Sequence, residues 1–233
     1  MKTILLCLSV FLSASLFGQN DLDYLNNGIN HYEAGEYEEA IDDYTRAIKI
    51  NPDFARAYYN RGIAYGDLGK VQEEIDDYTR AIKINPDLDS AYCNRGVSYN
   101  KLGKYQESIA DCNTAIRINP DNSDAYVIRG NAYFKLGKYK VAIADCNTAI
   151  KINPDDALAY YNRGCSYVEL GKYQEAIADF TGAIKINPDY ADAYLNRGVN
   201  KSKLGIDYCS DFKRACELGD EKGCIYFKMG NCN

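Results

Sequence analysis

The chain has 233 residues, and its 33 aspartates and glutamates outnumber its 27 lysines and arginines, which gives a formal net charge of −6. A protein that grips the phosphates of nucleic acid needs clustered positive charge, so this balance argues against nucleic-acid binding. Tryptophan is absent, and 22 tyrosines supply most of the aromatic volume.

The first segment, residues 1–20, is an apolar leader. One lysine precedes an apolar run over residues 4–17, and small residues stand near the end of that run. This order is typical of a secretory signal peptide, and the run is short for a transmembrane helix. We therefore expect an exported protein, periplasmic or extracellular, that is cleaved between residues 15 and 20.

After the leader, the sequence repeats itself every 34 residues. Every proline stands inside Asn-Pro-Asp at this interval: Pro52, Pro86, Pro120, Pro154 and Pro188. Two glycines recur with the same period, the first at Gly28, Gly62, Gly96, Gly130, Gly164 and Gly198, the second at Gly35, Gly69, Gly103, Gly137, Gly171 and Gly205. The pattern predicts six repeats over 21–218 and then a capping helix and tail at 219–233. The predicted repeats are 21–54, 55–88, 89–122, 123–156, 157–190 and a degenerate 191–218.

Each repeat carries two short amphipathic helices. In the fifth repeat, the apolar residues of the second helix recur with a period of 3.6, and Gly171 stands where a helix end favours a left-handed residue. Pro188 then ends the second helix, because the residue before a proline avoids the α region. Such a hairpin is too small to bury its own apolar faces, so it has to stack on copies of itself.

The period and the placing of small, aromatic and proline residues resemble the tetratricopeptide repeat family over residues 21 to about 218. The resemblance implies an all-α fold, a right-handed α-solenoid of stacked antiparallel helix pairs. It also implies a non-catalytic protein–protein interaction scaffold that binds an extended peptide segment in a concave groove.

The family pattern puts places 2, 5, 6, 9, 12 and 13 of each repeat on the groove face, counted from its first residue. Similar proteins hold a peptide backbone with a ladder of asparagines, and a primary amide both donates and accepts hydrogen bonds. The expected groove residues are the sixth-place amides and their fifth-place neighbours, Asn26, Asn60, Asn94, Asn162, Asn196, Tyr59, Val127, Tyr161 and Leu195. The alternative is that these asparagines merely belong to the framework of the family.

An arginine stands at place 7 from the second repeat onward, and an aspartate at place 23 of the first five repeats. In the family, the first helix of a repeat packs on the second helix of the preceding repeat. We therefore predict a ladder of inter-repeat ion pairs with charge-assisted hydrogen bonds: Asp43–Arg61, Asp77–Arg95, Asp111–Arg129, Asp145–Arg163 and Asp179–Arg197. The alternative is solvated charges, worth about 0–1 kcal/mol each.

The glycine at place 8 is expected to face a small residue at place 20 of its partner helix, as in Gly28–Ala40, Gly96–Ser108, Gly130–Ala142 and Gly164–Ala176. The second repeat has Glu74 at place 20. A carboxylate at a close helix contact is costly unless it reaches solvent, so we expect this hairpin to be the loosest.

The sequence offers no catalytic constellation. His31 is the only histidine and occupies a place held by tyrosine in later repeats, so we expect it to be packed. Triads based on histidine and zinc motifs that need two histidines are then excluded. We predict no enzymatic activity, no metal and no cofactor, and the partner is a protein or peptide.

Cysteines end the chain in a cluster. Cys112 and Cys146 stand where other repeats have a core aromatic residue, and we interpret them as free thiols. Facing residues of an antiparallel hairpin have a nearly constant sum of numbers, which predicts the disulfides Cys216–Cys224 and Cys209–Cys232. An oxidising compartment permits both bonds.

The Cys216–Cys224 spacing also matches the disulfide-closed hairpins of Sel1-like proteins. That resemblance implies the alternative function, a cysteine-rich envelope protein that binds or hydrolyses β-lactams or cell-wall components.

Overall fold

The computed structural model describes residues 20–230 and 232. Of the predicted leader only Asn20, the N-cap of the first helix, is among them. The described residues form thirteen α-helices and no strand, as the repeats predict. The helices are α1 (Asp21–Glu33), α2 (Tyr37–Ile50), α3 (Ala55–Asp67), α4 (Val71–Ile84), α5 (Asp89–Lys101), α6 (Tyr105–Ile118), α7 (Ser123–Lys135), α8 (Tyr139–Ile152), α9 (Ala157–Glu169), α10 (Tyr173–Ile186), α11 (Ala191–Lys203), α12 (Cys209–Glu217) and α13 (Glu221–Met229). None of these helices is both long enough and apolar enough to cross a membrane.

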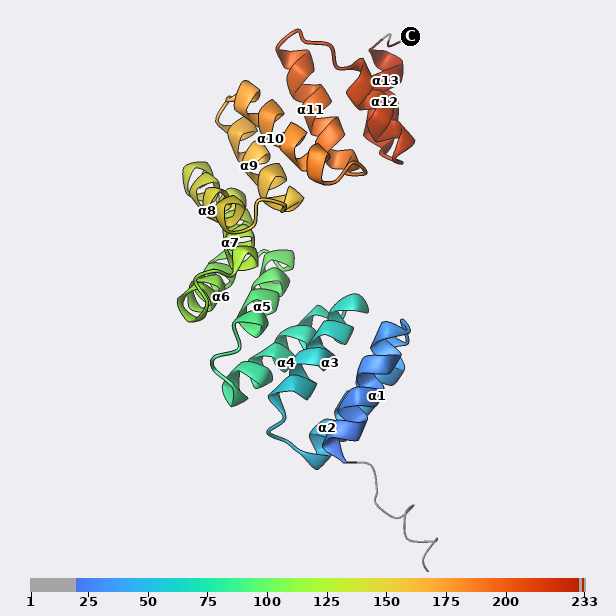
Figure 1. Cartoon of the computed structure of the whole chain (residues 1–233), viewed down its shortest axis with the longest axis vertical. Helices are drawn as coiled ribbons and strands as arrows, with labels where there is room; N and C mark the ends of the chain where they lie inside the picture. The colour runs from blue at the N-terminus through green and yellow to red at the C-terminus, as the bar shows by residue number, and fades with distance from the viewer. Residues whose placement is uncertain (1–19, 231, 233) are drawn as a thin grey trace, which may run out of the picture. The chain divides into compact units, whose positions relative to one another are not determined.

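The helices fall into two compact units, one ending at Pro86 and one starting at Asp87. In the first unit α1 packs on α2, α2 on α3 and α3 on α4. In the second unit every helix from α5 to α13 packs on the next, and α7 also touches α5 and α9 (Figure 1). Within each unit the chain therefore forms stacked antiparallel helix pairs.

The turn inside each pair depends on its glycine. Gly171 has φ 71°, the left-handed conformation expected from the sequence, and the other five turn glycines have φ between 68° and 80°. The amide of Lys172 donates to the Tyr167 carbonyl, and that of Gly171 donates to the Val168 carbonyl, both at 2.9 Å. These bonds form a Schellman motif, which satisfies the last carbonyls of the first helix.

The glycine at place 8 makes room for an aromatic ring, a contact that the sequence pattern did not predict. A methyl group on Gly164 would lie 2.8 Å from the Phe180 ring, and one on Gly28 would lie 2.6 Å from Tyr44. Gly62 and Gly198 likewise face the rings of Tyr78 and Phe212. The ring four residues after the small residue is therefore the nearest neighbour of the glycine in these four repeats.

The third and fourth repeats differ because a cysteine replaces the ring. A methyl group on Gly96 would lie 3.3 Å from the Cys112 sulfur and 3.5 Å from Ser108, the predicted neighbour. One on Gly130 would meet the Ala142 carbonyl and the Cys146 sulfur, each at 3.4 Å. The predicted small-residue contact is therefore confirmed for these two repeats and stays a prediction for Gly28–Ala40 and Gly164–Ala176.

The second repeat compensates for Glu74. This side chain is buried, 4% exposed, and its carboxylate occupies the space beside Gly66. A methyl group on Gly66 would lie 2.9 Å from the Glu74 carboxylate. Gly66 stands where the other repeats have a larger side chain. The space that it leaves accommodates Glu74 at place 20. The predicted looseness of this hairpin stays a prediction.

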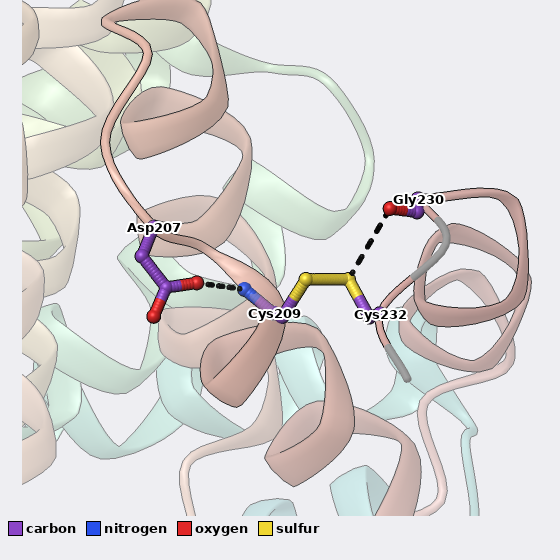
Figure 2. Close-up of a disulfide and its surroundings, with 4 residues drawn as sticks. All are labelled: Asp207, Cys209, Gly230 and Cys232. Carbon is purple, nitrogen blue, oxygen red and sulfur yellow. Dashed lines mark hydrogen bonds between the residues drawn. A yellow bond between two sulfur atoms is a disulfide. The ribbon is translucent and has the colours of Figure 1, made fainter.

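The chain ends in a cap of two short helices, α12 and α13, closed by two disulfides. Cys216 and Cys224 are bonded with their Cα atoms 4.4 Å apart, and Cys209 and Cys232 with theirs 5.3 Å apart, as the sequence predicts. The second bond ties Cys232, three residues beyond α13, to Cys209, the first residue of α12 (Figure 2). Gly219, with φ 91°, makes the tight turn between the two helices.

Replacing Gly164 by alanine should lower the free energy of unfolding by about 1–3 kcal/mol, because the new methyl group overlaps the Phe180 ring. The matched change Gly130→Ala should cost little or stabilise by up to about 1 kcal/mol, because its contacts are ordinary and alanine favours a helix. Urea titration followed by circular dichroism measures both. Equal effects of the two changes would contradict this packing.

Alkylation should separate three classes of cysteine. Burial raises the pKa of Cys112 and of Cys146 to about 12, so at pH 8 almost no thiolate is present and native protein should resist iodoacetamide. Unfolding without reductant should expose the four thiols outside the cap, and adding reductant should expose the four cap cysteines. Peptide mapping by mass spectrometry gives the result, and cap cysteines that are labelled without reductant would rule out the disulfides.

Candidate functional site

Each place-7 arginine binds the aspartate of its own repeat, so the predicted inter-repeat partners are wrong. Arg163 donates from Nε and Nη2 to the two Asp179 carboxylate oxygens at 2.8 and 2.6 Å. The same two-bond fork joins Arg61 to Asp77, Arg95 to Asp111, Arg129 to Asp145 and, in the sixth repeat, Arg197 to Asp211. The pairs are buried rather than solvated, because the aspartate side chains are 2–9% exposed and the arginines 15–19%.

The arginine still links neighbouring repeats, through its third donor. Nη1 of Arg163 donates to Asn147 at 2.6 Å, and Nη1 of Arg61 donates to Thr45 at 2.8 Å. These acceptors stand at place 25 of the preceding repeat, and Arg129 and Arg197 reach Asn113 and Thr181 in the same way. Each guanidinium also lies over the ring of the tyrosine three residues earlier, 5.3–5.8 Å from its centroid.

These contacts keep the arginines charged. The hydrogen bond to Asp179 raises the pKa of Arg163, although burial opposes the rise. In the second repeat, burial raises the pKa of the Asp77 carboxyl, while Arg61 acts to lower it. A bidentate, charge-assisted pair of this kind fixes the relative position of two helices better than a single contact does.

The first repeat has Asn27 at place 7 and uses other partners for its aspartate. Nδ1 of His31 lies 3.0 Å from the Asp43 carboxylate, and Arg46 donates to the same group at 3.3 Å. The His31 side chain is 40% exposed and lies half-buried against Asp43, at the same place as the tyrosines of later repeats.

Two hollows lie on the face formed by the first helices, which we call the groove face and define by places 2, 6, 9, 12 and 13. Hollow A, in the first unit, has about 270 Å³ and is lined by Ile29, Tyr32, Glu33, Tyr44, Arg56, Asn60 and Ile63. Hollow B, in the second unit, has about 350 Å³ and is lined by Val97, Asn100, Lys101, Val127, Ile128, Asn131, Leu158 and Asn162. Both hollows use the same places of successive repeats.

The sixth-place asparagines divide between the hollows and the framework. Asn162 lines hollow B, whereas Asn26 is exposed and Asn94 is half-buried. Asn60 lines hollow A but also hydrogen-bonds the hydroxyl of the buried Tyr44, whose pKa is raised by burial to about 12. The Asn196 amide donates to the Tyr161 hydroxyl at 2.9 Å. Groove and framework roles are thus combined in Asn60.

Of the predicted fifth-place groove residues, Val127 lines hollow B, while all four lie largely in the core. Val127 and Leu195 are only 4% and 8% exposed and belong to the hydrophobic core. The half-buried rings of Tyr59 and Tyr161 pack on Tyr78 and Phe180, with centroids 5.8 and 5.7 Å apart. A helix turns about 100° per residue, and this turn carries place 5 inward while place 6 stays at the surface.

The expected groove residues did not include the aliphatic residues at place 9, although these residues line the hollows. Ile29, Ile63 and Val97 lie three residues after the sixth place, hence on the same helix face, and this spacing was the signal that identifies them. No cluster of histidine, cysteine, aspartate or glutamate among the described residues could hold a metal ion.

Profiles of the tetratricopeptide repeat match most of the repeat region. One, described as TPR repeat, matches residues 30–69, 130–168 and 164–205. Two others, both described as tetratricopeptide repeat, match 55–88 with 90–122, and 112–144. The chain belongs to the tetratricopeptide repeat family. These matches end at residue 205, so the Sel1-like character of the cap stays a prediction.

Solved structures agree with this fold. A tetratricopeptide repeat protein from Parabacteroides merdae is 25% identical, with a TM-score of 0.70 over 89% of this chain and 84% of its own. YrrB, described as a TPR protein with an unusual peptide-binding site, is 23% identical, with a TM-score of 0.60 over 80% of this chain and 97% of its own. A chain of the APC/C hetero-tetramer Cut9-Hcn1 is 16% identical with a TM-score of 0.80; the match covers 91% of this chain but only 43% of that one. The comparison with curated proteins gave no match.

Replacing Asn60 by alanine should lower the free energy of unfolding by about 1–2 kcal/mol, because the buried Tyr44 hydroxyl loses its partner. Tyr44→Phe removes the other side of the same hydrogen bond. The double variant should therefore be no less stable than Asn60→Ala alone, which a double-mutant cycle in urea detects as coupling. Strictly additive losses would show that the two groups do not interact.

Proposed function

We propose that the chain is an exported, non-catalytic scaffold that binds an extended segment of a partner protein along the groove face. Family membership supports a protein-interaction scaffold, because tetratricopeptide repeats bind proteins and peptides. The observation that carries the peptide assignment lies within the second unit, where equivalent places of three successive repeats line hollow B. A periodic site suits a periodic ligand, and an extended peptide presents side chains at regular intervals.

Hollow B has the chemistry of a peptide site. Val97, Ile128 and Leu158 form an apolar lining, and Leu158 is 47% exposed. The amides of Asn131 and Asn162 stand beside this lining, and each amide offers donors and an acceptor to a peptide bond. Its volume of about 350 Å³ lies at the lower end of ligand sites, which suits one side chain with its backbone.

Export is supported by the cap. Two disulfides within the last 25 residues of the chain fit an oxidising compartment, the environment that the predicted leader would deliver the protein to. A peptide-binding site is also the property by which YrrB is described, and that protein shares the fold. The β-lactam or cell-wall alternative depends on the Sel1-like resemblance of the cap and stays a prediction.

Random twelve-residue peptides displayed on phage and selected on the disulfide-bonded chain provide a probe. Replacing Asn131 and Asn162 together by alanine should weaken the selected peptides by about tenfold to a hundredfold, because each lost amide removes hydrogen bonds worth about 1 kcal/mol. Far-ultraviolet circular dichroism should stay unchanged. Fluorescence anisotropy with labelled peptides gives the dissociation constants.

The control is Gln174→Ala, which removes an exposed amide from α10, outside the groove face. It should leave affinity unchanged. If the double asparagine variant loses its helicity, these residues are framework. If it binds like the control, the groove face is not the peptide site, and either result rejects the proposal.

A further inference from the structure

The cap helix α13 keeps the register of the repeats. If Glu221 is place 1, then Gly223, Cys224, Tyr226 and Met229 stand at places 3, 4, 6 and 9. Places 27 and 3 of neighbouring repeats are alanines packed together, as Ala183 and Ala193 are. In the cap, a methyl group on Gly223 would lie 2.7 Å from the methyl group of Ala215. The helix therefore sits where the first helix of a seventh repeat would sit, at a closer approach.

The disulfides replace a packing contact of the repeats. Places 28 and 4 are isoleucine and tyrosine elsewhere, and Ile184 and Tyr194 pack in one apolar cluster. The sixth repeat is two residues shorter before this point, because Arg197 and Asp211 are 14 residues apart whereas Arg163 and Asp179 are 16 apart. In the cap, Cys216 is therefore the counterpart of place 28 and Cys224 stands at place 4, and a disulfide joins them. The second bond holds Cys232, beyond α13, against the start of α12, and the Cys232 sulfur also contacts the Gly230 carbonyl (Figure 2). A nine-residue helix in which only Gly223 is buried is thus fixed covalently in the stacked position.

A third hollow lies between α11, α12 and α13. It has about 330 Å³ and is lined by Val199, Ser202, Lys203, Tyr208, Phe212, Tyr226, Met229 and Gly230. Val199, Ser202 and Lys203 hold places 9, 12 and 13 of the sixth repeat, and Tyr226 and Met229 hold places 6 and 9 of α13. Hollow A is built from these same places, so the cap hollow continues the set of groove-face sites.

The cap hollow is more aromatic than hollow B. The Phe212 ring lies 5.2 Å from that of Tyr208 and 5.4 Å from that of Tyr226, and Met229 is 75% exposed beside them. Tyr226 stands where five of the six repeats have an asparagine and the fourth has Ile128. The ammonium of Lys203 lies 4.7 Å from the Tyr173 ring centroid and brings positive charge to the rim. Rings and a thioether suit a large apolar side chain, and the lysine suits a neighbouring carboxylate.

We propose that α13 is a binding helix as well as a cap. Its hollow takes a large apolar side chain, next to an acidic residue, from the same extended partner segment. This inference rests on the proposed function, and it assigns to the two disulfides the task of holding a binding surface in place.

Met229 gives a direct test, because the chain has two methionines and the other is Met1. In disulfide-bonded protein carrying ¹³C-methyl methionine, the signal that Met229→Leu removes is that of Met229. Adding peptides selected from the phage library should shift this signal. The selected peptides should share an acidic residue next to a large apolar one.

Charge reversal supplies the second measurement. Lys203→Glu should weaken these peptides about tenfold, and replacing the peptide's acidic residue by lysine should restore binding to that variant. The matched change Lys213→Glu, at an exposed position of α12 outside the hollow, should change affinity less than twofold.

The outcomes separate the two proposals. Peptides that need Asn131 and Asn162 but leave the Met229 signal unmoved, and bind both lysine variants equally, overturn the role of α13 and leave the proposed function standing. If no peptide is selected, or binding ignores the two asparagines, the proposed function fails and this inference fails with it.

Discussion

The repeats depend on the fork between the place-7 arginine and the place-23 aspartate. In Arg163–Asp179 both side chains are largely buried, so removing either partner leaves an unpaired charge, at a cost of about 3–5 kcal/mol. The aspartate reaches the arginine because the adjacent glycine, Gly164, lets the second helix approach. The third guanidinium donor then binds Asn147 in the preceding repeat. One side chain therefore fixes the geometry inside a pair and between pairs, and the hollows of the groove face inherit their spacing from it.

The 34-residue period predicts the helices but not these partners. The helical fold, the turn glycines and the cap disulfides follow from local rules, and the structure has them as predicted. An arginine such as Arg129 has one aspartate 16 residues after it and another 18 residues before it, Asp145 and Asp111, and both recur every 34 residues. A strict repeat makes the two pairings equally regular. Only the helix face that carries place 23 decides between them.

The groove face shows the same limit at the scale of one residue. Tyr161 and Asn162 are neighbours in sequence, yet the first packs on Phe180 and the second lines hollow B. A sequence pattern of period 3.6 locates the exposed face of a helix to within about one residue on either side. The boundary between the buried place 5 and the groove-lining place 6 is only one residue wide. Asn60 adds a different difficulty, because the residue type that suits a peptide amide also suits the phenol of Tyr44. Composition alone does not separate the two roles.

The cap makes local opening of the helices differ between the two ends of the repeat array. In a repeat protein, stability is close to a sum over neighbouring interfaces, so local opening starts at the ends. At the α12–α13 end, two covalent bonds keep opened helices tethered, and the encounter that re-forms the interface becomes intramolecular and fast. Among the described residues the α1 end has no disulfide, and it is held by packing on α2, by the capping box of Asn20 and Asp23 and by the contact of His31 with Asp43. Proteases cleave transiently opened helices, so proteolysis begins at α1. The cap end is protected for as long as its environment stays oxidising.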